Sequence, residues 1–347
     1  MRYDLLVMGN DQGAVAGAVA AAKLNLRVGL VVSDAGWQTG GAERLAWGFW
    51  REVVAEALAE WSETSATGAD GRSTGASLET EFQRFRRQVT LTLEHEAEFQ
   101  QLELEHFGID VLVGQPEFTS PHEIVLRTGQ GVRHVTAERF LLATGARSGV
   151  PAKFGVNGRN ILDVTDLPKL SVVPRSVIVV GGGQSGLESA RYLARFGAQV
   201  TIVDGSQPLP DGRGRSADGL RELAEECRRL GVRWELGADV LALEPMADGQ
   251  VGLQLETGRR ICGEVVVCAT GWVGNTAGLN LPAAGISPDD RGRIWCDADG
   301  QTWARHISAT GAVVGHPAAA RYRAGEGTRV VCQALRSLID SRSLVAG

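Results

Sequence analysis

The sequence has no excess of positive charge and no stripe of basic residues. Its 347 residues include 35 Lys and Arg against 41 Asp and Glu, and the two signs are interspersed along the chain. A protein that follows the phosphates of a nucleic acid needs clustered Lys and Arg side chains. We therefore expect no nucleic-acid partner.

Long apolar runs are also missing. The alanine-rich stretch 15–22 comes nearest to a membrane or signal segment, but it is too short to span a bilayer, and Asp4 and Asp11 precede it. We predict that this stretch is a buried helix, and we expect no membrane partner. The hydrophobic share of 44% is enough for the cores of two ordinary domains.

Cysteine is scarce and lacks the spacing of a metal or redox site. The five cysteines are an odd number, include no CxxC pair and lie mostly in apolar segments: Cys227, Cys262, Cys268, Cys296 and Cys332. This usage is typical of reduced thiols in a cytosolic protein, so we expect a cytoplasmic location. The sequence shows no metal site.

Two segments have the order strand, glycine turn, helix and strand that is typical of a dinucleotide-binding unit. The first comprises an apolar run over 3–8, a turn, a small-residue helix to about Leu24 and a second run over 27–32. The second comprises a strand over 176–180, a turn over 181–186, a helix over 187–196 and a strand over 199–203. The repetition predicts an α/β fold with two Rossmann-like units.

Between the two units the sequence predicts two helices and a small antiparallel sheet. Apolar side chains recur every three or four residues along the first helix, and we interpret them as core packing rather than ligand stacking: Trp47, Trp50, Val54, Leu58 and Trp61. A loop over 65–77 precedes a long charged helix that ends near Gly108. Residues 109–126 alternate as antiparallel strands do, and a turn follows at 129–131.

The second unit carries a complete dinucleotide fingerprint. This fingerprint needs one glycine for a tight turn, a second where the backbone meets the pyrophosphate, and a third where helix packs on strand. Gly181, Gly183 and Gly186 occupy these positions in order. The acid that binds the adenosine ribose is expected about 20 residues on, at the end of the next strand, where Asp204 stands. A 2′-phosphate would meet this carboxylate, so the sequence favours NAD(H).

The first unit departs from that pattern. Gly9 and Gly13 are present and Ala14 can fill the packing position, but Asp11 stands where the backbone should approach the pyrophosphate. A carboxylate about 4 Å from a pyrophosphate charge is repelled by about 4 kcal/mol at an effective dielectric of about 20, unless its side chain rotates away. Val32 stands where the ribose-binding acid is expected, so a charged hydrogen bond is missing as well.

The order of these pieces resembles the pyridine nucleotide-disulfide oxidoreductases, and within them most closely the soluble transhydrogenases. The similar segments are GQPEFTSPHEIVL at 114–126, AERFLLATGARSGVPA at 137–152, PRSVIVVGGGQSGLESA at 174–190 and GNTAGLNLPAAGISPDDRGRIWCDADGQT at 274–302. The resemblance implies a glutathione-reductase-like FAD/NAD(P) fold. A discontinuous FAD-type Rossmann domain would comprise residues 1–150 and 271–347, with an NAD(H)-binding Rossmann domain over 151–270 inserted in it. The family's C-terminal interface domain, through which relatives form dimers, has no counterpart before Gly347, so the oligomeric state stays open.

The resemblance also implies which residues contact the two cofactors. In the family a glycine turn, an ATG turn and a later GD pair hold FAD, and the implied contacts here are Gly9, Gly13, Thr144, Gly145 and Gly311. For the NAD(H) half the expected cofactor-binding residues are Gly181, Gly183, Gly186, Glu188, Asp204 and Gly271. Asp11, Val32 and Ala312 depart from the FAD motif.

Two further family positions differ beside the flavin. The redox cysteines of relatives correspond to positions near Arg44 and Phe49, so disulfide chemistry is not expected. The lysine that pairs with a glutamate in relatives corresponds to Val53, whereas the glutamate itself is retained as Glu188. If buried without a cation, Glu188 would have a raised pKa or must find another hydrogen-bond donor.

Two functions therefore stay open for a protein that we expect to bind small-molecule dinucleotides. One is a flavoprotein oxidoreductase that takes hydride from NADH to FAD and passes it to an unknown acceptor. The other is a noncatalytic protein that binds or senses NAD(H) and has lost FAD. The nearby Arg213 and Arg215 also leave the phosphorylated dinucleotide open. We assign no catalytic residue.

Overall fold

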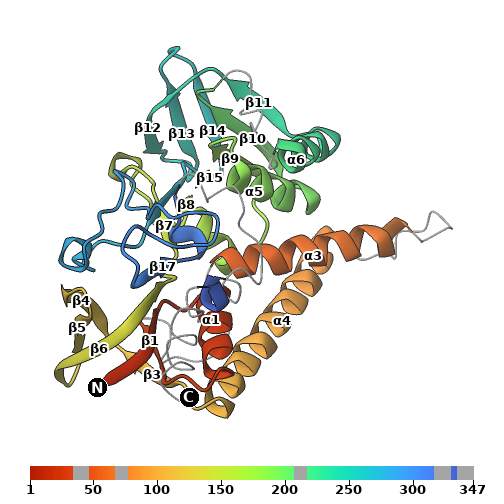
Figure 1. The fold of residues 1–347 in the computed structure, drawn as a ribbon. Helices are drawn as coiled ribbons and strands as arrows, with labels where there is room; N and C mark the ends of the chain where they lie inside the picture. The colour runs from red at the N-terminus through yellow and green to blue at the C-terminus, as the bar shows by residue number, and fades with distance from the viewer. Residues whose placement is uncertain (34–46, 67–76, 207–216, 316–329, 334–347) are drawn as a thin grey trace. The chain divides into compact units, whose positions relative to one another are not determined.

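A computed structural model describes residues 1–33, 47–66, 77–206, 217–315 and 330–333 (Figure 1). The chain divides into two compact units. The first comprises Met1–Val53, Thr90–Arg147 and Val273–Gly347, and the second comprises Val54–Val89 and Ser148–Trp272. Residues 54–89, 148–150 and 271–272 group with the second unit, whereas the predicted ranges assign them to the FAD-type domain. The chain passes between the units at 53/54, 89/90, 147/148 and 272/273, and the last two crossings lie in strands β7 (Ala146–Ser148) and β16 (Trp272–Gly274).

The first unit is built on a seven-stranded sheet with the order β3-β2-β1-β6-β5-β4, and β17 also pairs with β6. Its strands are β1 (Arg2–Met8), β2 (Val28–Val32), β3 (Asp110–Val113), β4 (Gln115–Ser120), β5 (Glu123–Thr128), β6 (Gly131–Leu142) and β17 (Ile307–Ala309). The predicted antiparallel sheet is confirmed over β4, β5 and β6. β3 differs, because it pairs parallel with β2.

Three helices among the described residues lie between β1 and β3 in the sequence: α1 (Gln12–Ala22), α3 (Trp47–Ala66) and α4 (Leu78–His106). The prediction of a buried small-residue helix is confirmed, since Ala18 and Ala21 of α1 are fully buried. α3 continues through Ala66, two residues into the predicted loop, and residues 67–76 lie outside the described part. On its predicted apolar face Trp50, Val54 and Leu58 are buried. The side chains of Trp47 and Trp61 lie outside the described residues.

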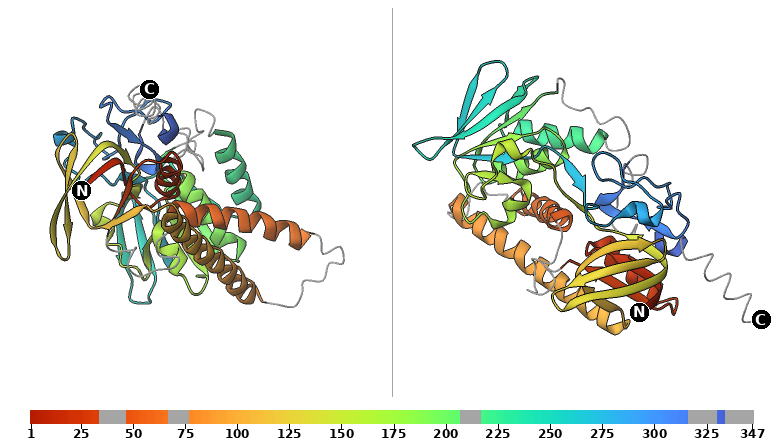
Figure 2. Two further views of the ribbon diagram at one scale, coloured as in Figure 1. Left: turned by 60° about the horizontal axis from the view of Figure 1, so that its bottom comes forward. Right: turned by 90° about the vertical axis from the view of Figure 1, so that its left-hand side faces the viewer.

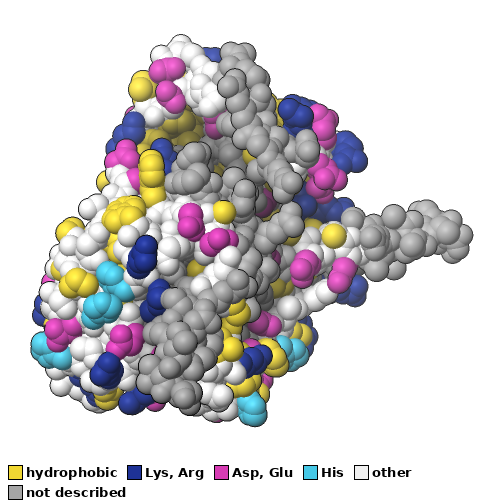
Figure 3. Space-filling view, in the orientation of Figure 1, with side chains coloured by type: hydrophobic (Ala, Val, Ile, Leu, Met, Phe, Trp, Pro, Cys, Tyr) yellow, Lys and Arg dark blue, Asp and Glu magenta, His cyan; other side chains and the backbone are white. Residues whose placement is uncertain are grey.

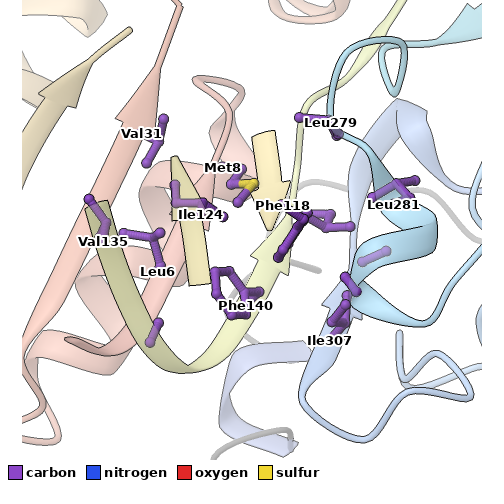
Figure 4. Packing of buried hydrophobic residues seen from close by; sticks show 14 of the residues in the cluster. Leu6, Met8, Val31, Phe118, Ile124, Val135, Phe140, Leu279, Leu281 and Ile307 are labelled. Carbon is purple, nitrogen blue, oxygen red and sulfur yellow. The ribbon is translucent and has the colours of Figure 1, made fainter. Parts of the chain in front are cut away.

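Apolar clusters cover the sheet of the first unit. One joins α1 to β1 and β2 and includes Leu5, Val7 and Val32. The other contains side chains of β1, β4, β5, β6 and the segment from Leu279 to Ile307 (Figure 4). There Phe118 and Phe140 meet edge to face, with ring centroids 4.9 Å apart. Short 3-10 helices follow at η4 (Leu281–Ala284) and η5 (Gly311–Val313).

The second unit contains a five-stranded parallel sheet with the order β11-β10-β9-β15-β8. Its strands are β8 (Ile161–Asp163), β9 (Ser176–Val180), β10 (Gln199–Asp204), β11 (Arg233–Leu236) and β15 (Val265–Cys268). The helices are α5 (Gln184–Arg195), α6 (Ala217–Arg229), η2 (Ala152–Phe154) and η3 (Val164–Lys169). A three-stranded antiparallel sheet comprises β12 (Val240–Pro245), β13 (Val251–Leu255) and β14 (Arg260–Gly263), drawn in blue-green in Figure 2.

An aromatic cluster explains why the first part of α4 groups with the second unit. Phe82 and Phe85 of α4 pack against Tyr192 and Phe196, at the end of α5, with ring centroids between 5.1 and 6.1 Å apart. Both phenylalanines are almost fully buried. Since each buried aromatic ring removes a large apolar area from water, this cluster attaches residues of α4 to the second unit.

The described residues show neither a membrane span nor a metal cluster. Within them no helix combines the length and the apolar character that crossing a bilayer requires. In the same part of the chain, His, Cys, Asp and Glu side chains nowhere gather in a group of three suited to a metal ion. On the face drawn in Figure 3, Lys and Arg side chains are interspersed with Asp and Glu.

Replacing Phe140 by alanine tests the core of the first unit. Phe140 is 1% exposed, so Phe140→Ala is expected to lower the free energy of unfolding by about 3 to 5 kcal/mol, measured by chemical denaturation. Val132 lies on the same strand with 56% of its surface exposed, and Val132→Ala should change stability by less than about 0.5 kcal/mol. Equal effects of the two substitutions would contradict this packing.

Candidate functional site

Each unit has a glycine turn directly after its central parallel strand. Gly9 follows β1 with φ +131°, and Gly181 follows β9 with φ +111°. A side chain on Gly9 would overlap the carbonyl oxygen of Ala143, and one on Gly181 would overlap that of Ala269. Both positions therefore require glycine for the backbone angle and for the close approach. In each unit the carbonyl belongs to the first residue of an Ala-Thr-Gly segment.

In the second unit the turn leads into an uncapped helix. A Cβ atom on Gly186 would overlap the carbonyl oxygen of Gly181, so this glycine allows α5 to pack on the turn. Gly183 is the N-cap residue of α5, and no side chain caps the helix there. A Cβ atom on Gly183 would have open space within 4 Å. The backbone at Gly183 is thus accessible to an anion, which the first N–H groups of a helix can bind.

Asp204 lies beside this turn, at the carboxyl end of β10. Its Oδ2 accepts a hydrogen bond from the backbone N–H of Gly182 at 2.5 Å, and its Oδ1 accepts one from Ser206 at 2.7 Å. The side chain is half-buried. The structure therefore brings Asp204 together with Gly181, Gly183 and Gly186, as the fingerprint predicts.

Three more residues border the same turn. Gln184 Nε2 donates to Glu188 Oε1 at 3.0 Å. The predicted need for another donor applied only to a buried Glu188. Glu188 is half-buried rather than buried. Gly271 has φ +108° and its carbonyl accepts from the N–H of Gly149 at 2.9 Å. Trp272 was not predicted: its Nε1 donates to Ser185 Oγ, in the first turn of α5, at 3.0 Å. The sequence signal that could have identified Trp272 was its position directly after Gly271.

In the first unit, Asp11 caps the helix that follows the turn. Its Oδ1 accepts a hydrogen bond from the backbone N–H of Ala14 at 2.8 Å. The backbone angles of Asp11 are φ −76° and ψ 170°, and those of Gly183 are φ −73° and ψ −176°. The two N-cap residues share one conformation and differ in the side chain. The Asp11 side chain therefore does not rotate away from the predicted clash, because its carboxylate lies at the N-terminus of α1.

The other expected FAD contacts surround this turn. A Cβ atom on Gly13 would lie 3.3 Å from Asp11 Oδ1 and 3.3 Å from Thr310 Cγ2. Thr310 is buried and precedes Gly311, which has φ +86°. The structure therefore brings Gly13 and Gly311 to the same place. Ala312 is exposed and supplies no carboxylate there.

The Ala-Thr-Gly segment of the first unit contains a buried hydroxyl without a partner. Asn275 holds the segment, since its Nδ2 donates to the Thr144 carbonyl at 3.1 Å and its backbone N–H donates to the Gly145 carbonyl at 3.0 Å. The side-chain Oγ1 of Thr144 has no hydrogen-bond partner among the described residues. A buried hydroxyl of this kind indicates a missing partner.

Val32 closes the end of β2 with an apolar side chain. It is 1% exposed and packs in the cluster formed with α1. Its carbonyl accepts a hydrogen bond from the N–H of Gly114, the residue between β3 and β4, at 3.0 Å. The position where a ribose-binding acid would stand is therefore part of the core.

The residues present fit NAD(H) at the second turn and do not fit FAD at the first. The second turn combines an uncapped helix with an acid at the end of β10. The first turn has its own carboxylate at the helix N-terminus, a buried valine at the end of β2 and an exposed alanine at 312. The Thr144 hydroxyl is the feature on this side that points to an absent group.

The cysteines do not form a redox pair among the described residues. All five are free, and Cys227, Cys268 and Cys296 are buried. Burial raises the pKa of the Cys268 thiol to about 12 and that of the Cys227 thiol to about 11. Since the thiolate is the nucleophile, both are unreactive at neutral pH. Of the positions where relatives have redox cysteines, Arg44 lies outside the described residues, and so does the side chain of Phe49.

One protein-family model matches almost the whole chain. The model of the pyridine nucleotide-disulphide oxidoreductases matches residues 3–327. The chain belongs to this family. The resemblance inferred from the sequence is thereby confirmed, and a pyridine-nucleotide and FAD oxidoreductase ancestry accounts for the repeated Rossmann-type unit.

Relatives within the family include soluble transhydrogenases. Soluble pyridine nucleotide transhydrogenase of Mycobacterium bovis (strain BCG / Pasteur 1173P2) is 30% identical over 326 residues, which are 92% of this chain and 67% of that protein. The protein of the same name from Vibrio vulnificus (strain YJ016) is 26% identical over 335 residues, which are 96% of this chain and 70% of that protein.

Solved structures share the fold. The HOCl-induced flavoprotein disulfide reductase RclA from Escherichia coli, as its Cu(II) complex, superposes with a TM-score of 0.78 at 23% identity, over 97% of this chain and 71% of RclA. LpdA from Mycobacterium tuberculosis superposes with a TM-score of 0.78 at 24% identity, over 96% of this chain and 72% of LpdA. These likenesses show an α/β fold of the flavoprotein disulfide reductase type.

Thiol titration tests the burial of the cysteines. Cys262 and Cys332 are exposed, so we expect a thiol reagent at about pH 8 to modify them in the native protein and to reach Cys227, Cys268 and Cys296 after unfolding. The Cys262→Ser variant should lose one of the rapidly reacting thiols. Modification of four or five thiols in the native protein would contradict the structure.

Proposed function

We propose that the chain binds NAD(H) in its second unit and holds no FAD in its first. The observation that carries this proposal is the contrast between the two N-cap residues, Gly183 and Asp11. They have the same backbone conformation, but Gly183 leaves α5 uncapped whereas the Asp11 carboxylate caps α1. Only the second turn is prepared for the pyrophosphate of a dinucleotide.

Different residues of the second unit would bind the pyrophosphate and the adenosine ribose. Backbone N–H groups at the start of α5 would hold the pyrophosphate, because Gly183 has no side chain to block its approach. Asp204 would accept hydrogen bonds from the adenosine ribose, and its orientation is held by the N–H groups of Gly182 and Ser206. A bound nicotinamide ring carries hydride chemistry. The carboxylate at Asp204 favours NAD(H) over a dinucleotide with a 2′-phosphate.

In this form the protein binds or senses NAD(H) without passing hydride to a flavin. A cytoplasmic location stays a prediction from the cysteine usage. Transhydrogenase activity is not proposed for this chain, because Asp11, Val32 and Ala312 do not suit a bound flavin.

A second function is favoured by the hydroxyl of Thr144. Its lack of a partner in the described structure, next to Gly145, fits a flavoprotein oxidoreductase that transfers hydride from NADH to FAD and on to an acceptor. The colour of the purified protein separates the two functions. The proposal is supported if the purified protein shows no flavin absorbance at about 450 nm and gains none on incubation with FAD. A yellow protein that NADH bleaches would overturn it.

Substitution of Asp204 tests the dinucleotide site. Asp204→Ala removes the ribose acceptor, so we expect NADH binding, measured by calorimetry, to weaken by about 1.5 to 3 kcal/mol. Asp204→Asn keeps one acceptor oxygen for the turn and separates loss of binding from loss of folding. Glu222 is exposed on α6, and Glu222→Ala removes an equal charge without a change in affinity. Unchanged NADH affinity in both Asp204 variants would contradict the site assignment.

A further inference from the structure

We propose that Asp11 is an internal anion that takes the place of a nucleotide pyrophosphate at the N-terminus of α1. The first unit then folds without flavin, and the chain has one dinucleotide site instead of two. This inference rests on the part of the proposed function that gives the first unit no FAD, and it does not depend on NAD(H) binding in the second unit.

The position of the carboxylate is the first step. The backbone angles of Asp11 match those of Gly183 within about 15°, counted across ±180°. In the glycine version of this turn the space in front of the helix is open. In the aspartate version the side chain enters that space, and its Oδ1 reaches the N–H of Ala14 at 2.8 Å. The carboxylate is thus placed where a bound phosphate would accept from the same helix.

The electrostatics of α1 give the second step. The first N–H groups of a helix have no partner within the helix, and they carry a partial positive charge. No residue in the first turn of α1 itself is acidic. The Asp11 carboxylate therefore supplies both what a pyrophosphate supplies in a glycine turn: an acceptor for a helix N–H and a negative charge at the positive end of the helix.

The surroundings of the carboxylate give the third step. A Cβ atom on Gly13 would lie 3.3 Å from Asp11 Oδ1 and 3.3 Å from Cγ2 of the buried Thr310, so the carboxylate lies in a confined space. A pyrophosphate would have to share this space with a like charge. Val32, buried in the core at the end of β2, offers no acceptor for a ribose. Asp11 and Val32 therefore both favour a first unit that folds without a bound nucleotide.

Thermal unfolding of Asp11 variants tests the internal anion. Asp11→Ala is expected to lower the melting temperature by about 2 to 4 °C, whereas Asp11→Asn, which can still cap the helix, should lower it less. Glu98→Ala removes an equal charge from the exposed face of α4 and serves as the control, with no shift expected. An Asp11→Ala protein as stable as the wild type would overturn the proposal.

Flavin addition supplies a second readout on the same proteins. Wild type should gain no thermal stability from FAD or from inorganic pyrophosphate. The double variant Asp11→Gly, Ala312→Asp should be stabilised by FAD, because it reopens the turn and restores an acid at an exposed position without placing a charge in the core. Stabilisation of the wild type by FAD, or a flavin that copurifies with it, would overturn the proposal.

The reciprocal substitution in the second unit tests the mechanism of exclusion. Gly183→Asp introduces the carboxylate at a position with open space and a matching backbone, so the variant should fold and cap α5. We expect its NADH affinity, measured by calorimetry, to fall by a factor of about 100 to 1000. Gly183→Asn adds a side chain of the same shape without the charge, and its loss should be smaller.

The outcomes distinguish this inference from the proposed function. If wild type binds no NADH, the proposed function fails, and the melting temperatures of the Asp11 variants still decide the inference. If wild type binds NADH and Gly183→Asp binds it equally well, the exclusion argument fails while the proposed function stands.

Discussion

The architecture of each unit depends on one close approach between a glycine and a carbonyl group. Gly9 lies against the carbonyl of Ala143, and Gly181 lies against that of Ala269. In both cases the carbonyl follows the parallel strand on one side, whereas the next strand in sequence pairs on the other side. The turn therefore opens at the point where the strand order reverses, and it directs a helix N-terminus there, where α/β proteins bind their ligands.

Because the two turns share this backbone, the side chain at the N-cap position decides which acceptor the first N–H groups of the helix meet. At Gly183 no side chain caps α5, whereas Asp11 caps α1 from within the chain. The remaining differences between the units agree with this choice. At the end of the second strand, Asp204 presents a half-buried carboxylate beside the turn, but Val32 is enclosed in the core.

Features that follow from local spacing could be predicted from the sequence, and contacts between residues distant in sequence could not. The turn at Gly181 and the acid at Asp204 follow from spacing, because glycine positions report backbone angles directly. The N-cap role of Asp11 was missed, although an aspartate directly before an alanine-rich helix is the usual signal for it. The grouping of residues 54–89 with the second unit rests on contacts such as Phe82 with Phe196, which are distant in sequence. No local pattern encodes that pairing.

The cap on α1 also separates the first unit from cofactor supply. A bound ligand stabilises a fold by an amount that rises with the logarithm of its free concentration. A flavin-dependent unit therefore loses stability in a cell that runs short of flavin. The Asp11 carboxylate is covalently attached, so its effective concentration at the helix is constant. If Asp11 replaces the pyrophosphate as proposed, the first unit keeps the same stability at every level of cellular flavin.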